Sequence, residues 1–212
     1  MKKLLSIAML CSLGLAHTNY FIGIGAGNYQ DTLHEKVVGD RGGINYEKYT
    51  ANNGGGTIKT GVIINNRQKL TIYYTHIFTL REDEQDNYAI EDKSKNVIGA
   101  IYDFYLPTKT NFKPFIGLGY SYHMFKESLN NTNDTTWDDP KIANINVSSI
   151  DGSLGFDYFI SKHFFIGLDI LISATTFGGD DKEGFTYNGE HYTTTITEQN
   201  MINSALSLNF KF

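Results

Sequence analysis

Eight charged side chains at odd-numbered positions are the residues of this sequence whose types and spacing could do chemistry together. Each lies in a segment where polar and apolar residues alternate, and a strand places all its odd residues on one face. The eight are Lys59, Lys69, Asp103, Lys113, Asp151, Asp157, Asp169 and Lys211. Four acids and four bases can neutralise one another, so we expect a network of ion pairs and hydrogen bonds. We expect Asp103 and Lys113, which flank one short turn, to pair.

Hydrolytic chemistry would need a nucleophile beside a histidine base. His76 is the one ionisable residue on the even-numbered strand face; Thr75 and Thr79 lie nearby, but no serine stands two residues away. His191-Tyr192-Thr193 has that spacing but falls in a predicted loop. We therefore predict no catalytic residue and no enzyme, and interpret His76 as a polar residue at the boundary of the apolar face.

Acidic residues gather in Arg81-Glu82-Asp83-Glu84-Gln85-Asp86, and carboxylates in series suit hard divalent cations. No stretch has the ligand spacing of a calcium loop, so we interpret the segment as a solvated surface and predict no metal site and no cofactor. Trp137, the only tryptophan, lies at a predicted loop tip. It is the candidate contact residue for a partner, although it could instead pack against neighbouring loops.

The elements that must position these residues are eight alternating segments, most of them close to the roughly 9 to 11 residues that a tilted strand needs to cross a bilayer. The predicted strands are residues 19–29, 54–64, 69–79, 95–106, 112–123, 147–160, 163–175 and 199–212. Short turns at 65–68, 107–111 and 161–162 alternate with long polar connections at 30–53, 80–94, 124–146 and 176–198. This rhythm predicts an all-β, eight-stranded, antiparallel, transmembrane up-and-down β-barrel with both termini in the periplasm.

The even-numbered strand residues are the apolar set, and the odd set holds the charges and most strand glycines. A lysine or arginine facing lipid at the bilayer midplane costs about 2 to 4 kcal/mol, so the apolar face must point outward. The soluble alternative, a lipocalin-like barrel with the apolar face inside, would leave only eight charges to solvate a glycine-rich exterior. Because an eight-stranded barrel is barely wide enough for its own side chains, we predict a plugged lumen; a gated narrow channel using the same charges is the alternative.

The N-terminal end of the chain has the pattern of a targeting signal. Lys2 and Lys3 precede an apolar run that ends at Ala16, the pattern of a secretory signal peptide. We predict a signal peptide over 1–16 and one barrel domain over 17–212. The formal net charge of −5 disfavours nucleic acid as a partner.

Three segments carry a family resemblance: Tyr20-Phe21-Ile22-Gly23-Ile24-Gly25-Ala26-Gly27, Pro114-Phe115-Ile116-Gly117-Leu118-Gly119-Tyr120-Ser121-Tyr122, and the ending at Phe212. They resemble the small bacterial outer-membrane β-barrel superfamily, which includes OmpA-type transmembrane domains, opacity-type adhesins and OmpW-like proteins. The resemblance implies a location in the outer membrane, with lipid and lipopolysaccharide as surroundings. It also implies that Phe210 and Phe212 form the signal read by the barrel-assembly machinery.

The resemblance to this superfamily implies a role in adhesion, envelope integrity or passage of small hydrophobic molecules. Our leading expectation is a non-enzymatic barrel that displays four acidic surface loops to a host or envelope ligand. The alternative is an OmpW-like narrow channel for small hydrophobic solutes, which would require a lateral opening or an apolar trough.

Overall fold

The computed structural model describes residues 18–39, 42–79, 89–130, 141–178, 181–187 and 190–212. Within these ranges it contains nine strands: β1 (Thr18–Gly39), β2 (Ile44–Ile64), β3 (Gln68–Thr79), β4 (Ala89–Tyr105), β5 (Phe112–Asn130), β6 (Lys141–Phe159), β7 (Phe164–Gly178), β8 (Asp181–Tyr187) and β9 (Glu190–Lys211). Among the described residues, no helix is both long and apolar enough to cross a membrane.

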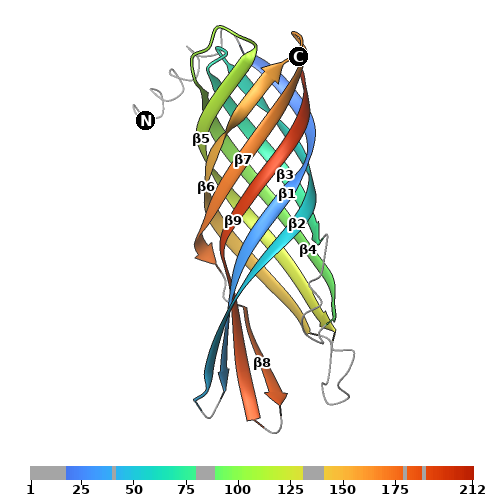
Figure 1. Ribbon diagram of the computed structural model, residues 1–212, viewed down its shortest axis with the longest axis vertical. Helices are drawn as coiled ribbons and strands as arrows, with labels where there is room; N and C mark the ends of the chain where they lie inside the picture. The colour runs from blue at the N-terminus through green and yellow to red at the C-terminus, as the bar shows by residue number, and fades with distance from the viewer. Residues whose placement is uncertain (1–17, 40–41, 80–88, 131–140, 179–180, 188–189) are drawn as a thin grey trace, which may run out of the picture.

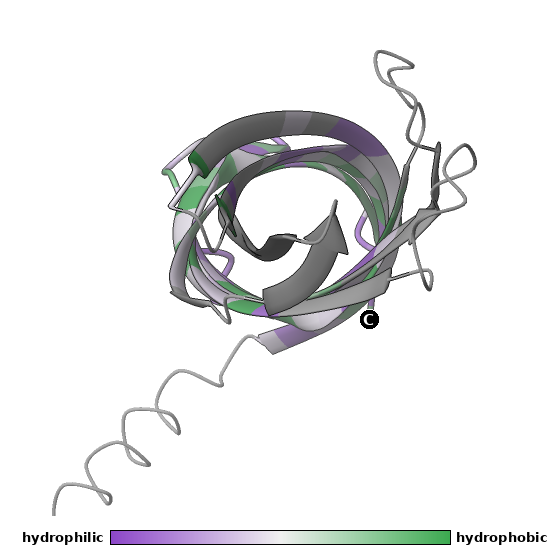
Figure 2. Ribbon diagram, turned by 90° about the horizontal axis from the view of Figure 1, so that it is seen from below, coloured by the Kyte–Doolittle hydropathy of each residue, from purple (hydrophilic) through white to green (hydrophobic). Residues whose placement is uncertain are grey.

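Eight of these strands close into a barrel. β1 to β7 pair in sequence order, all antiparallel, β7 pairs with β9, and β9 returns to β1 from Phe21↔Lys211 to Gly39↔Tyr192. Figure 2, which looks along the barrel, shows the strands as a ring around a central axis. The predicted fold, an eight-stranded antiparallel up-and-down barrel, is confirmed. β8 pairs with the far part of β9 and lies beyond the ring (Figure 1).

The three short turns lie where the alternation predicts them, at the end of the barrel that also holds the C-terminus (Figure 1). In the first turn Asn65 and Asn66 have φ of 52° and 53°, a left-handed conformation that asparagine tolerates and that suits tight hairpins. Arg67 N donates to Ile64 O at 3.0 Å and closes this turn.

The strands reach much further at the opposite end than the sequence predicts. β1 and β2 stay paired to Val38↔Ile44, and β8 and β9 pair from Asp181↔Ile196 to Tyr187↔Glu190. Much of the predicted loops 30–53 and 176–198 is therefore strand, because a backbone ladder forms without any need for apolar alternation. The outer parts of β1 and β2, up to Val38↔Ile44, form a projecting sheet beyond the ring together with β8 and the part of β9 that pairs with it (Figure 1). We call this sheet the extension.

The predicted outer and inner faces are confirmed. Even-numbered residues of the barrel wall are exposed, as Ile72, Leu118 and Leu206 show with 55%, 69% and 58% of their surface accessible. Odd-numbered residues such as Phe21 and Phe165 are fully buried inside. Such an apolar exterior is stable only when hydrocarbon, rather than water, surrounds it.

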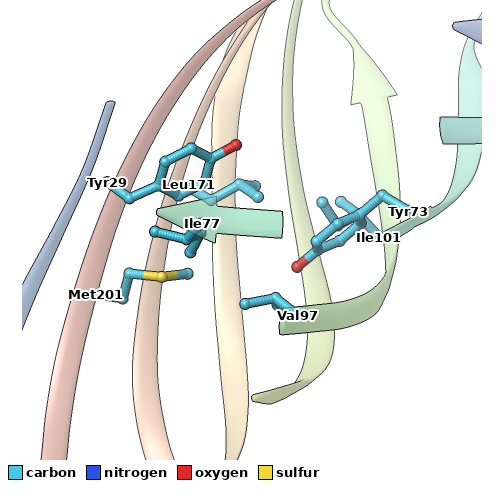
Figure 3. Packing of buried hydrophobic residues seen from close by; sticks show 7 residues of the cluster. All are labelled: Tyr29, Tyr73, Ile77, Val97, Ile101, Leu171 and Met201. Carbon is cyan, nitrogen blue, oxygen red and sulfur yellow. The ribbon is translucent and has the colours of Figure 1, made fainter. Parts of the chain in front are cut away.

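The lumen contains two apolar clusters. The inner cluster, next to the short turns, consists of Phe21, Ile63, Tyr105, Phe115 and Phe165, with Phe159 packed against it. The outer cluster, nearer the extension, consists of Tyr29, Tyr73, Ile77, Val97, Ile101, Leu171 and Met201. Figure 3 shows the side chains of the outer cluster, which come from β1, β3, β4, β7 and β9.

Gly99 provides the space that one ring of the outer cluster occupies. A Cβ at Gly99 would lie 2.5 Å from the Cζ and hydroxyl oxygen of Tyr73, closer than carbon atoms pack. On the lipid face, a Cβ at Gly152 would meet nothing nearer than the Ile172 carbonyl at 3.9 Å.

We therefore expect Gly99→Ala to destabilise the barrel and Gly152→Ala to leave it unchanged or slightly more stable. Overpacking a filled interior costs about 1 to 3 kcal/mol, whereas replacing glycine in a strand removes an entropic penalty. Urea titration of the folded fraction, read from the heat-sensitive mobility of folded barrel on gels, measures both. Equal midpoints for the two variants would contradict the packing argument.

Candidate functional site

A charge layer lies in the lumen between the two apolar clusters. Lys69 Nζ lies 3.1 Å from Asp157 Oδ2, 3.4 Å from Asp103 Oδ2 and 3.8 Å from Asp169 Oδ1. Lys59 Nζ donates to Asp169 Oδ2 at 2.7 Å. The side chains of Lys69, Asp103 and Asp157 are each at most 2% exposed. Two bases and three acids thus form one largely buried group, with Asp169 partly exposed, and the attraction among them is strong because little water reaches them.

Neutral groups add further contacts to this charge layer. The Tyr105 hydroxyl donates to Asp157 Oδ2 and the Ser153 hydroxyl donates to Asp103 Oδ1. Lys69 Nζ also sits 3.7 Å above the centroid of the Phe115 ring. Hydrogen bonds and a cation–π contact offset the cost of removing these charges from water.

Glycines on neighbouring strands make room for the luminal charges. Five charged residues each face a glycine directly across the ladder: Lys59 faces Gly23, Asp103 faces Gly117, Asp151 faces Gly119, Asp157 faces Gly167 and Asp169 faces Gly155. A side chain at Gly117 would collide with Asp103, and one at Gly167 would lie 2.8 Å from Asp157 Oδ1. The charged side chains of the odd face therefore fit into the lumen because glycines leave space for them on the neighbouring strands.

Asp151 belongs to a separate polar group nearer the extension. Its carboxylate accepts a hydrogen bond from Ser121 Oγ at 2.9 Å and from the Tyr73 hydroxyl at 3.3 Å. Ser121 Oγ also lies 2.8 Å from His123 Nε2. Sequence reasoning centred the search for a hydrolytic pair on His76 and missed Ser121-x-His123, which shares one strand face.

This serine–histidine pair is arranged unlike a nucleophile and its base. Since the single hydroxyl proton of Ser121 goes to Asp151, His123 Nε2 must donate to Ser121 rather than accept its proton. Ser121, His123 and Asp151 are also completely buried, so no substrate reaches them in this conformation.

A separate buried ion pair lies further out. Lys95 Nζ is 2.9 Å from Asp31 Oδ1, and Asn53 Nδ2 donates to Asp31 Oδ2 at 3.3 Å. Sequence reasoning assigned Asp31 to a loop and so missed the pair. The signal was present, because Asp31 continues the odd positions of Tyr29 and Gly27 on the same strand.

The predicted pair of Asp103 with Lys113 is wrong. The hairpin register sets Asp103 opposite Gly117, so Lys113 lies beyond the last paired residues, towards the turn. Lys113 Nζ donates to the Thr108 carbonyl at 3.1 Å, and Lys211 Nζ lies 5.4 Å from the centroid of Phe159. Of the eight predicted luminal charges, these two lysines lie at the short-turn mouth.

On the lipid face, His76 takes part in a small polar group. The Tyr74 hydroxyl donates to Asn96 Oδ1 at 2.7 Å, and His76 Nδ1 lies 2.9 Å from the same oxygen. Thr75 points the other way, into the lumen, where its hydroxyl lies 2.8 Å from Thr57 Oγ1. Residues 1–16, the acidic segment 81–86 and Trp137 lie outside the described residues.

Comparison with known proteins supports this architecture. Residues 84–184 match the family model described as the OmpW family. The crystal structure of Neisserial surface protein A superposes with a TM-score of 0.59 at 13% sequence identity, over 91% of this chain and 97% of that one. A major outer membrane protein from Thermus thermophilus superposes with a TM-score of 0.53 at 10% identity, over 92% of this chain and 100% of that one. Among curated protein sequences, none matches the chain.

The likenesses to solved structures establish the fold, and the match to the OmpW family points to the bacterial outer membrane. An apolar exterior around a charged and closely packed interior is the arrangement that this membrane requires. The chain has the fold of the small outer-membrane β-barrels, is similar to the OmpW family over residues 84–184, and has the apolar exterior expected of a protein in the bacterial outer membrane.

Proposed function

We propose that this protein is a non-enzymatic outer-membrane barrel that displays its extension and loops to host surfaces or envelope components while its lumen stays closed. The observation that carries the proposal is the filling of the lumen. An apolar cluster, the charge layer and a second apolar cluster follow one another along the barrel axis.

The two apolar clusters and the charge layer between them form a plug, and opening it would cost free energy. A through-path would have to separate Lys69 from carboxylates at 3.1 and 3.4 Å and leave charges in an interior with little water. Breaking a buried ion pair costs several kcal/mol. The void beside the charge layer, lined in part by Thr71 and Asn203, has a volume of only about 30 Å³, the space of a water molecule or two.

The extension supports the display role. It continues the ladders of β1, β2 and β9 beyond the apolar band of the wall, and Ile44 at its tip is 55% exposed. Folded strands hold a contact surface in place at lower entropic cost than flexible loops do. The acidic segment 81–86 and Trp137 remain candidate contacts with lipopolysaccharide or a host ligand.

The machinery that assembles outer-membrane barrels is a second class of partner. Phe212 pairs with Tyr20 through backbone hydrogen bonds of 2.9 and 3.0 Å, and the two rings stack with centroids 6.2 Å apart. Phe210 and Phe212 are exposed on the lipid side. This exposure supports a role for the two rings as the signal that the barrel-assembly machinery recognises.

A second candidate function is conduction of small hydrophobic solutes. The match of residues 84–184 to the OmpW family favours it. It would require a lateral opening in the wall or movement of the plug, so transport measurements separate the two candidates.

The first of three predictions from the proposed function concerns the plug. We expect Lys69→Met to destabilise the barrel by about 3 to 5 kcal/mol, because it leaves the buried carboxylates of Asp103 and Asp157 and the partly exposed Asp169 facing Lys59 alone. Lys113→Met is the matched control, since Lys113 contacts a neutral carbonyl and should cost under about 1 kcal/mol. Urea unfolding of both variants in one detergent measures the difference, and similar losses would show that the charge layer has no special weight.

The second prediction concerns conduction. Purified barrel in planar bilayers should show no steady openings in the nanosiemens range, because the plug fills the lumen. Insertion is checked in the same preparation by flotation with liposomes. Steady openings would refute the closed lumen, and faster entry of a small apolar dye into liposomes containing the protein would favour the second candidate.

The third prediction concerns the extension. Replacing residues 32–50 by an Asn-Gly turn between the paired Asp31 and Ala51 should preserve the barrel and remove about half of the projecting sheet. We expect at least a tenfold loss of binding to immobilised lipopolysaccharide or to epithelial monolayers. Arg67→Gln, at the opposite end, is the control. Unchanged binding by the truncated protein to both surfaces would contradict a display role for the β1–β2 hairpin.

A further inference from the structure

We propose that the short-turn mouth of the barrel is a binding site for a small phosphate-bearing molecule with an aromatic or apolar portion. The site is the cavity of about 370 Å³ at this mouth. Small-molecule sites in proteins begin at about this size. The proposal concerns the end opposite to the extension, so it stands independently of the display role.

Positive charge is concentrated at this mouth. Lys113, Lys162 and Lys211 line the cavity, and Arg67 and Lys109 lie in neighbouring turns. The segments 65–68, 106–113 and 160–163 contain no aspartate or glutamate. Clefts lined by one sign of charge raise the local concentration of ligands of the opposite sign. This end therefore attracts anions, whereas the long loops of the opposite end are rich in acids.

Within the described part of the chain, no side-chain carboxylate forms an ion pair with the lysines of the mouth. The ion pairs found there involve Lys59, Lys69 and Lys95, none of which lines this cavity. Lys113 Nζ contacts the carbonyl of Thr108, and Lys211 Nζ faces the Phe159 ring. A carbonyl and a ring face leave the full positive charge of each lysine available to an incoming anion.

The remaining walls select the class of anion. Asn66, Asn111 and Ser161 offer amide and hydroxyl donors at the rim, which can hydrogen-bond phosphate oxygens that the lysines leave free. Tyr105 and Phe159 form an aromatic wall. A ligand with a phosphate and a ring would satisfy both parts, the phosphate at the lysines and the ring against the aromatic wall.

The cavity is a pocket rather than the entrance to a pore. Its aromatic residue Tyr105 belongs to the inner cluster and also donates to Asp157 of the charge layer. Phe159 stacks on Phe165 with centroids 4.9 Å apart. A ligand that enters from the short-turn side is therefore held at the mouth, where its phosphate can stay in contact with water and with the lysines.

Phenyl phosphate is the probe that tests the proposal. Isothermal titration of the folded barrel in phosphatidylcholine nanodiscs at low salt should give saturable binding to one site. We expect the double variant Lys162→Gln with Lys211→Gln to bind at least tenfold more weakly. The double variant Arg67→Gln with Lys109→Gln removes the same charge from the same end but leaves the cavity lining intact, so its affinity should stay within about twofold of wild type.

Two further ligands test the two parts of the site. Inorganic phosphate should bind more weakly than phenyl phosphate, and benzyl alcohol should not bind measurably. Absence of saturable binding, equal weakening by both double variants, or equal affinity for benzyl alcohol would overturn the proposal. The heat-sensitive gel mobility of each variant confirms that it is folded.

Nanodiscs that contain phosphatidylglycerol distinguish two sources of the phosphate. Competition between this lipid and phenyl phosphate would identify a membrane headgroup as the occupant of the mouth. Affinity that is independent of the lipid would identify a soluble molecule on the short-turn side. Both outcomes support the phosphate site. It is contradicted if phenyl phosphate does not bind in nanodiscs made only of phosphatidylcholine.

Discussion

Hydrocarbon around the barrel leaves its charged strand residues a single direction in which to point. Placing a lysine or arginine in the midplane lipid costs about 2 to 4 kcal/mol, so the charges turn into a lumen that is only as wide as its side chains. There they must neutralise one another. The charge layer around Lys69, the pair of Asp31 with Lys95 and the hydrogen-bonded Asp151 all follow from this constraint.

The same constraint explains the glycines. A luminal charge needs space beside its own strand, and a glycine across the ladder provides it, as Gly117 does for Asp103. The bulky rings of the inner and outer clusters then fill the remaining cross-section on either side of the charge layer. The plug is thus a property of the whole odd-numbered face rather than of a few residues.

The alternation of the wall could be predicted from sequence because lipid acts on every strand in the same way. Strand order, the three tight turns and the inward direction of the charges follow from it. The partners of those charges could not be predicted, because the register between strands joined by a long connection, such as β3 and β4, has no local signal. Lys69 meets Asp103 through that register. The extension was missed because strands beyond the membrane need not alternate, and Asp31 was missed because the predicted strand ended at residue 29 although the alternation continues.

The extension has a mechanical consequence. Its strands β1 and β9 are also the two strands that meet to close the barrel, and their ladder runs without interruption, apart from one bulge at Thr32/Leu33, from the tip to Phe21. A pulling force applied at the tip acts along this β1–β9 ladder. Such a shearing force strains many hydrogen bonds together instead of peeling them apart singly, so attachment at the tip need not open the wall.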